Sequence, residues 1–245
     1  SSWSVIFAII GIAVTAIGVA GIWLIDDSKI KTEGNQNYLA NIVYGFRPSV
    51  IKENSRLYIC LAAFAFFGIS VQIFMPYLIL YYEVSLGMTD YVFVMAPAII
   101  LASVATALWG KVYDRRGFGF SVRWSLIALA AGYVLLYFFR HTALVFVGSL
   151  LMMCGYLAGM AVFGAMLRDY TPVGKAGMFQ GQRIIGQVLI PGVVGPAIGK
   201  KVLENAELLV NSDGTTSFVP NENIFLAAGI ALLLVLPFFL RQKNK

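Results

Sequence analysis

The sequence predicts an all-α integral membrane protein with seven transmembrane helices. Hydrophobic residues make up 59% of the 245 residues and charged residues only 12%, and the mean hydropathy is +0.80. This apolar share is far above that of a soluble domain. It is concentrated in stretches that can cross a bilayer core of about 30 Å, which takes about 20 helical residues. The predicted spans are 4–25, 57–82, 91–109, 124–139, 143–167, 184–199 and 224–240.

The first and last spans each carry a further expectation. Span 4–25 lacks the basic residues that precede the apolar core of a signal peptide, so we interpret it as a true span. Because the chain starts with Ser1 and enters the membrane at once, we expect it to be a fragment or a processed half of a longer protein. The span 224–240 has no polar side chain from Phe225 onward, which predicts a helix that faces lipid on the outside of a bundle.

The spans 124–139 and 184–199 are short, and arginines flank them. Arg123 and Arg140 border the first, and Arg183 precedes the second. Long basic side chains can extend to the membrane interface, so these positions are compatible with spans.

Basic residues predict the orientation. Of the 18 Lys and Arg residues, all but three fall in 26–56, 110–123, 168–183 and 241–245. The three exceptions are Arg140, Lys200 and Lys201. The positive-inside rule puts the basic set in the cytoplasm, the N-terminus outside and the C-terminus inside. Topology thus accounts for the net charge of +6, and we expect no nucleic-acid partner.

Two connecting segments are long enough to have structure of their own. In 26–56, a polar linker is followed by a short amphipathic helix, because apolar residues recur at helical spacing over 38–46. This segment is either a tether between two membrane bundles or an ordinary loop helix. Residues 208–219 predict a β-hairpin around Asp213-Gly214, which is either a lid over an outer cavity or a decorative loop.

A charged segment, Gly110-Lys111-Val112-Tyr113-Asp114-Arg115-Arg116-Gly117, lies between the third and fourth spans. Four of its eight residues are charged, in a chain that is otherwise poor in charge. We expect a tight turn bracketed by Gly110 and Gly117, with a local ion-pair network. Its position between spans indicates helices that move against each other.

The span 184–199 is unusually rich in proline and glycine. Pro191 and Pro196 remove backbone donors, and Gly192 and Gly195 let backbones approach closely. We predict a helix hinge at Pro191, Gly192, Gly195 and Pro196, with static tight packing as the alternative.

The charged segment resembles the cytoplasmic signature of the major facilitator superfamily, Gly-x-x-x-Asp-Arg-x-Gly, at Gly110, Asp114, Arg115 and Gly117. The family pattern continues with two basic residues, whereas here the next basic residue after Arg116 is Arg123. The Gly-Pro-x-x-Gly pattern of the sixth span is similar to one that marks helix five in drug antiporters of this family. Here it falls in the symmetry-related helix eleven, so it does not imply antiport.

The resemblance implies a twelve-helix fold of which this chain holds helices six to twelve. Residues 1–25 would be the last helix of an N-terminal bundle absent from this chain, and 26–56 the central cytoplasmic loop. Residues 57–245 would form the C-terminal six-helix bundle. The chain would then be a multi-pass protein of the plasma or inner membrane. Its partners would be the lipid bilayer, the N-terminal six-helix bundle and a small-molecule substrate.

The family works by alternating access, in which two bundles rock around a site near the middle of the membrane. Asp114 would be the acceptor in the latch that holds the cytoplasmic side closed, and Arg115 would be its partner. Gly110 and Gly117 would allow the turn. No cofactor is implied. A symporter of this kind couples transport to H⁺ or Na⁺.

Polar side chains near the middle of the spans are few. Gln72, Tyr156 and Gln187 are the candidate substrate-binding residues, and uncharged amides and phenols suit a neutral, hydroxyl-rich ligand such as a sugar. Hydrogen bonding between helices is the alternative for all three. Tyr77, Tyr81, Tyr82 and Trp109 lie nearer the span ends, where we expect an interfacial aromatic belt rather than substrate contacts.

Three other functions remain as alternatives. A seven-helix receptor has the same topology but would have an outside cysteine pair, whereas Cys60 and Cys154 both fall within spans. An exporter of drugs or metabolites belongs to the same superfamily. A membrane-embedded enzyme is disfavoured, because His141 is the only histidine and neither a catalytic set nor metal-ligand spacing is apparent.

Overall fold

The computed structural model describes residues 2–24, 44–210 and 216–240. The chain divides into two compact units, Ser1–Ala40 and Asn41–Lys245, which we describe separately. In the first unit, α1 (Ser2–Leu24) is a continuous apolar helix that coincides with the first predicted span. The predicted amphipathic helix over 38–46 lies almost entirely outside the described residues.

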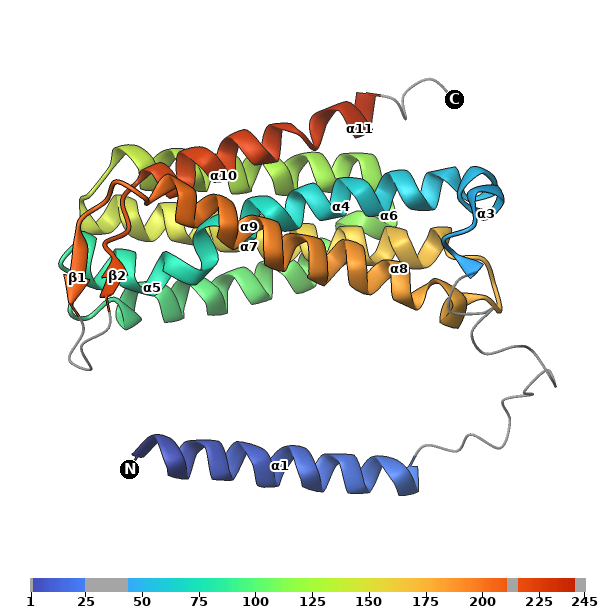
Figure 1. Ribbon diagram of the computed structural model, residues 1–245, viewed down its shortest axis with the longest axis horizontal. Helices are drawn as coiled ribbons and strands as arrows, with labels where there is room; N and C mark the ends of the chain where they lie inside the picture. The colour runs from blue at the N-terminus through green and yellow to red at the C-terminus, as the bar shows by residue number, and fades with distance from the viewer. Residues whose placement is uncertain (1, 25–43, 211–215, 241–245) are drawn as a thin grey trace. The chain divides into compact units, whose positions relative to one another are not determined.

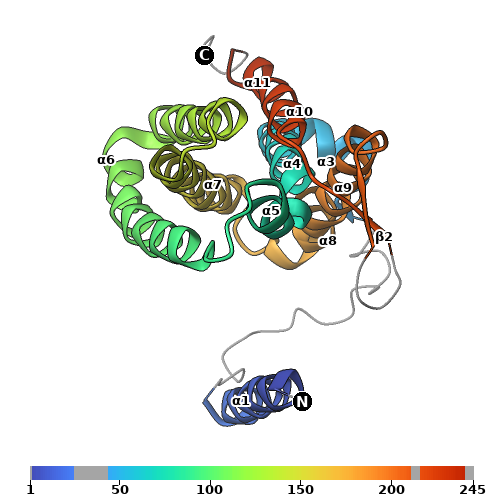
Figure 2. The same cartoon turned by 90° about the vertical axis from the view of Figure 1, so that its left-hand side faces the viewer.

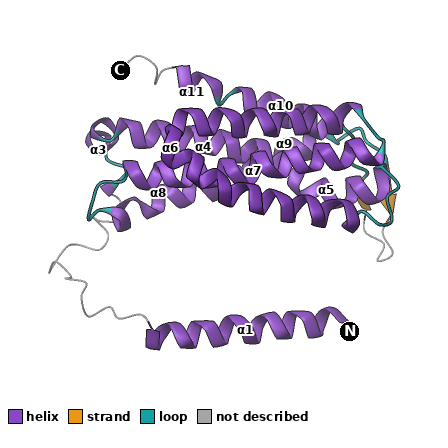
Figure 3. Cartoon of the chain, turned by 180° about the vertical axis from the view of Figure 1, so that it is seen from behind, coloured by secondary structure: helices purple, strands orange, loops and turns teal. Residues whose placement is uncertain are grey.

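The second unit is a helical bundle with one short hairpin (Figures 1 and 3). Its principal elements, in chain order, are α3 (Pro48–Glu53), α4 (Ser55–Phe74), α5 (Leu78–Leu80), α6 (Val92–Phe138), α7 (Thr142–Tyr170), α8 (Gln180–Ile184), α9 (Ile190–Val202), β1 (Leu208–Val210), β2 (Thr216–Phe218), α10 (Asn223–Leu233) and α11 (Leu236–Leu240). Short 3₁₀ turns (Met75–Tyr77, Ala176–Phe179) and π turns (Tyr81–Ser85, Ile185–Leu189) join some of them.

Among the described residues, four helices are long and apolar enough to cross a membrane: Ser4–Leu24, Ser55–Ser85, Val92–Phe138 and Thr142–Tyr170. The third is 47 residues long and contains two of the predicted spans. The remaining two predicted spans correspond to α8–α9 and to α10–α11, which are interrupted by a π turn and by a break at Leu234. The prediction of an all-α membrane protein is confirmed.

The predicted loop between the third and fourth spans is a kink in α6. Helical structure runs through Gly110 and Asp114, and only Gly117 departs from it, with φ 75° and ψ 177°. The expectation that Gly110 helps to form the turn is therefore wrong. A backbone at these angles is essentially restricted to glycine, because a Cβ atom would clash with the neighbouring peptide.

The kink folds α6 back along α7. Figure 2, which looks along the helices, shows the two halves of α6 on either side of α7. Figure 1 shows the kink side, α3 and α11 at one end of the bundle and the hairpin at the other. The hairpin pairs Leu208 with Phe218 and Val210 with Thr216, as predicted, although its turn lies outside the described residues.

Glycines set the closest approaches between helices. A Cβ atom on Gly155 would lie 2.3 Å from the backbone nitrogen of Leu129, and one on Gly132 would lie 2.5 Å from that of Met152. These two contacts join the second half of α6 to α7 in antiparallel order. In a bilayer, where burial of apolar surface between helices gains little, such van der Waals contact is a main source of helix association.

Aromatic rings fill the centre of the bundle. Phe64 and Phe163 stack with ring centroids 5.1 Å apart, and Tyr81 meets Phe225 edge-on at 5.0 Å. Tyr81 and Tyr82 are only 1% and 0% exposed. The prediction of an interfacial belt is wrong for this pair, because they face the bundle interior.

Buried hydroxyl groups link the helices. Ser70 donates to the Ala228 carbonyl at 2.7 Å and lies 3.0 Å from the Tyr133 hydroxyl. Tyr81 donates to the Leu136 carbonyl at 3.1 Å, and the Tyr82 hydroxyl meets the Ser149 hydroxyl. Each polar group buried in hydrocarbon needs such a partner, so these bonds fix the order in which the helices pack.

The last span has two faces although it is wholly apolar. Phe225 and Ala228 are buried against the rest of the bundle, whereas Leu226, Ile230 and Leu233 are exposed. The expectation of a peripheral helix fits this pattern. The turn after Leu233, with Pro237 in α11, divides it into two segments.

The contact at Gly155 gives a first prediction. Gly155→Ala should destabilise the bundle by about 1–3 kcal/mol, because the methyl group must displace the α6 backbone. Gly164→Ala is the matched control in the same helix, since a Cβ there meets nothing within 4 Å. Thermal unfolding of the purified protein in detergent should show a lower midpoint for Gly155→Ala and an unchanged midpoint for Gly164→Ala. Equal midpoints would contradict the packing role.

The kink gives a second prediction. Gly117→Ala should cost about 1–3 kcal/mol through backbone strain alone, because there is open space around the site. Gly119→Ala, two residues later with helical angles, should be neutral or slightly stabilising. Chemical denaturation of both variants measures the difference. A neutral Gly117→Ala would show that the left-handed conformation is not required.

Candidate functional site

The charged segment presents its acidic and basic side chains to the outside of the unit. Asp114, Arg115 and Arg116 are all exposed. Asp114 forms no ion pair with any residue that the structure describes, so the expected local ion-pair network is not found. Arg116 lies over the Phe120 ring, with 5.3 Å to the ring centroid. The Asp114 carboxylate and the Arg115 guanidinium are therefore exposed on the surface of this unit, where another group could contact them.

Tyr113 is the residue of this segment that bonds within the bundle. Its hydroxyl donates to Asp169 Oδ2 at 2.7 Å, and Arg168 pairs with the same carboxylate at 3.4 Å. Asp169 belongs to the C-terminal turn of α7. The bond thus ties the turn before the kink to the end of α7. Sequence reasoning missed it, because a Tyr and an Asp that are 56 positions apart carry no local signal.

A second cluster anchors the chain that leads into the bundle at this same end. Lys175 donates to the Tyr44 hydroxyl at 3.0 Å and lies over the Tyr44 ring. The hydrogen bond to Tyr44 raises the pKa of the Lys175 ammonium above its usual value. Tyr58 donates to the Gly45 carbonyl. Together these contacts hold the start of the second unit against the α7–α8 connection.

Gln72 and Gln187 belong to the α4–α9 side of the bundle. Leu61 contacts Gly186, and Gly68, further along α4, contacts Pro191. Because the residue numbers increase on both sides of the contact, the two helical segments run parallel. A Cβ on Gly195 would lie 2.4 Å from Gln72 Cβ. Gln72 therefore lies at the closest approach of the pair, and Gln187 lies about two turns before Gly195 on the facing helix.

Tyr156 comes from a different helix pair. On α7 it follows Gly155, which contacts α6, and precedes Gly159, whose Cβ position is 2.5 Å from the Phe67 ring. Gln72, Tyr156 and Gln187 are all half-buried. The structure places them on three helical segments, and they form no hydrogen bond with one another.

None of these three side chains forms a hydrogen bond to another residue that the structure describes. The amide nitrogen of Gln187 is buried and unpartnered. In the described part of the chain, these three side chains therefore do not form the hydrogen bonds between helices that were the alternative role for them. Unmet amide and phenol groups leave hydrogen-bonding capacity for a ligand.

The predicted hinge residues differ among themselves. Pro191 and Gly195 are buried against α4, where they provide close packing. Gly192 faces open space, and Pro196 lies within α9 without ending it. The departure from α-helical geometry is the π turn Ile185–Leu189, which lies before the prolines. Such turns often occur at functional positions in helices.

An ion pair closes the other end of the bundle. Arg140 contacts Glu222 at 2.9 Å, and its guanidinium also caps the end of α6 by donating to the Leu136 and Tyr137 carbonyls at 3.1 Å. The pair joins the α6–α7 turn to the start of α10. Because both side chains are about two-fifths exposed, the pair itself adds little stability.

The chemistry available within the spans is that of neutral hydrogen bonding. The described Asp and Glu side chains lie at helix ends, in connections or, for Asp114, in the charged segment next to the kink of α6. Among the described residues, no group of three His, Cys, Asp or Glu could hold a metal ion.

Comparison with known proteins gives one match. The family model described as Major Facilitator Superfamily matches residues 1–196, which include α1, the kinked α6 and most of α9. No curated protein and no solved structure matches the chain. Since the match covers well over half of its length, the chain is a multi-pass membrane transporter that belongs to the major facilitator superfamily.

Proposed function

We propose that the chain supplies one bundle of a secondary active transporter that moves a small neutral solute, such as a sugar, by alternating access. The observation that carries this proposal is a set of uncharged polar side chains that have no hydrogen-bond partner among the described residues: Gln72, Tyr156 and Gln187. Amide and phenol groups pair well with the hydroxyl groups of such a solute. None of the three side chains carries a charge, which favours a neutral solute over an ion.

The kinked segment serves as the cytoplasmic gate in this proposal. Asp114 and Arg115 are exposed, so both can meet a second bundle that faces them. A charge-assisted hydrogen bond to Asp114 would hold that side closed. The bond from Tyr113 to Asp169 fixes the segment to α7, so a force on Asp114 is passed to the bundle rather than to a loose loop.

Coupling to H⁺ or Na⁺ would use groups outside this bundle. The described carboxylates lie outside the apolar middle of the spans, so we place the coupling residues in the N-terminal bundle. We propose a plasma or inner membrane location, and the distribution of basic residues supports an orientation with the kink and the C-terminus on the cytoplasmic side. Family membership favours this transporter over the receptor and enzyme alternatives.

The gate predicts a transport defect in a variant that keeps the shape of the Asp114 side chain and removes its charge. Asp114→Asn should reduce uptake by about tenfold or more without lowering the amount of protein, because the latch loses its anionic acceptor. Uptake into cells that express the full-length transporter is the measurement. Asp90→Asn, an exposed carboxylate in the α5–α6 connection, is the control and should transport normally. Normal transport by Asp114→Asn would exclude the latch role.

The binding residues predict a change in KM. Gln72→Ala, Gln187→Ala and Tyr156→Phe should each raise KM by about 2- to 10-fold, the loss of one net hydrogen bond. Protein amount should be unchanged. A panel of radiolabelled neutral sugars supplies the substrates.

Gln182→Ala separates binding from packing. The Gln182 side chain is only 4% exposed and lies against Gly45, so its loss should lower the amount of folded protein. If the three candidate variants behave like Gln182→Ala, with less protein and an unaltered KM, their role is packing.

A further inference from the structure

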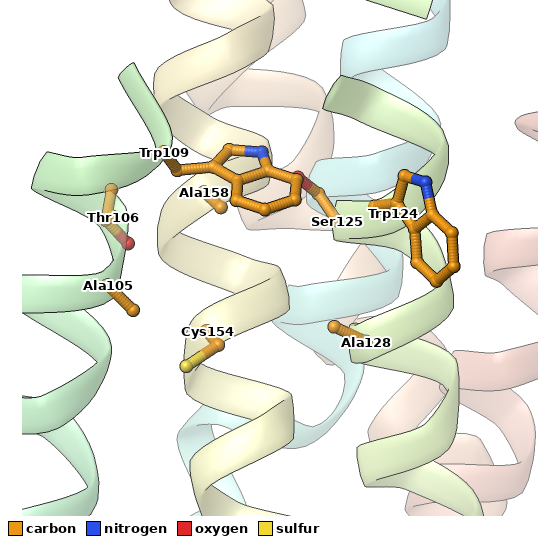
Figure 4. Close-up of a pocket in the computed structure, with 8 residues that line it drawn as sticks. All are labelled: Ala105, Thr106, Trp109, Trp124, Ser125, Ala128, Cys154 and Ala158. Atoms are coloured by element: carbon orange, nitrogen blue, oxygen red, sulfur yellow. The ribbon is translucent and has the colours of Figure 1, made fainter. Parts of the chain in front are cut away.

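A small pocket opens between the two halves of α6 and α7 (Figure 4). Its volume is about 150 Å³. It is lined by Ala105, Thr106, Trp109, Trp124, Ser125, Ala128, Cys154 and Ala158. The helix halves before and after Gly117 thus form its two sides, and α7 forms its floor.

The pocket lies in the apolar turns next to the kink. Trp109 is the last residue of the predicted span 91–109, and Trp124 is the first residue of the span 124–139. Both therefore mark the membrane interface, where tryptophan is enriched. Trp124 is 50% exposed, so the pocket adjoins the lipid-facing surface of the bundle. Molecules with an apolar body and one polar group prefer this zone, for the same reason that tyrosine and tryptophan do.

Most polar groups of the pocket are already used. The Trp109 indole N–H donates to the Ser121 carbonyl at 3.3 Å, and the Ser125 hydroxyl donates to the same carbonyl at 2.9 Å. Thr106 differs, because its hydroxyl oxygen is buried and has no hydrogen-bond partner among the described residues. In Figure 4, the Thr106 hydroxyl and the Cys154 sulfur both lie on the pocket side of their helices.

Size and lining together define a ligand class. No charged side chain lines the pocket, which excludes ions and zwitterions. An engineered apolar cavity of about 150 Å³ accommodates benzene. The Thr106 hydroxyl oxygen is covered in the structure, so a rotation of this side chain toward the pocket would let it form a hydrogen bond with a ligand that carries one donor or acceptor.

We propose that this pocket binds a small neutral molecule of about the size of one aromatic ring, with a single hydroxyl group that pairs with Thr106, and that the molecule enters from the bilayer. Because the ligand contacts α6 on both sides of Gly117, its binding stabilises the kinked arrangement of the two halves. The site goes beyond the transport function and does not depend on the transported solute.

Cys154 provides a direct reporter of occupancy. The full chain carrying Cys60→Ala, in lipid nanodiscs, is labelled with N-ethylmaleimide while phenol or benzene is titrated. Both compounds should slow the labelling of Cys154, and phenol should act at the lower concentration. Thr106→Val should weaken protection by phenol about 2- to 10-fold and leave protection by benzene unchanged. An equal change for both compounds would overturn the role of Thr106.

A pocket-filling variant tests the location. Ala105 is exposed and lines the pocket, so Ala105→Leu fills it without disturbing the buried core. Protection by phenol and by benzene should both be lost. Protection that persists in Ala105→Leu, or that is absent in the parent, would overturn the proposal.

Tryptophan fluorescence covers the case in which Cys154 does not react. In the variant with Trp3→Phe and Trp23→Phe, only Trp109 and Trp124 remain of the four tryptophans. Saturable quenching by 4-bromophenol, lost in Ala105→Leu, supports the site. Quenching that rises linearly and is the same in both proteins contradicts it.

Discussion

Backbone contact at glycine is the constraint on which the bundle depends. Gly132 and Gly155 bring α6 and α7 together, and Gly68, Gly195 and Gly199 do the same for α4 and α9. In lipid, burial of apolar side chains between helices gains little, so the stability of the bundle comes from close packing and from satisfied polar groups. These two helix pairs then meet through the aromatic rings of α4 and α7.

Buried hydroxyl groups specify which helices pair and at which register. Ser70 meets Tyr133 and the Ala228 carbonyl, and so joins α4, α6 and α10 at one level. Tyr82 and Ser149 join the end of the α4 span to α7. A shift of one helix by a single turn would leave these groups unsatisfied in hydrocarbon, which is costly. By contrast, Gln72, Tyr156 and Gln187 have no such partners within 2–24, 44–210 and 216–240, which distinguishes them from the structural polar groups.

Much of the architecture follows from the sequence, because hydropathy reports burial in lipid directly. The spans, the hairpin at 208–219 and the position of the charged segment could all be predicted in this way. The form of the segment could not, since Lys, Asp and Arg are compatible with a helix and a single glycine suffices for the reversal. Distance along a span also does not tell which side of a helix faces the bundle, so Tyr81 and Tyr82 could not be distinguished from interfacial residues. The bond from Tyr113 to Asp169 depends on tertiary packing that the local sequence does not report.

The kink at Gly117 has a mechanical consequence. A flexible loop would give the two spans many torsional degrees of freedom, and they could slide past each other along the membrane normal. Here helical residues border the glycine on both sides, so φ and ψ of one residue carry nearly all of the relative freedom. The two spans are therefore mechanically coupled, and a displacement of one span rotates the other about Gly117.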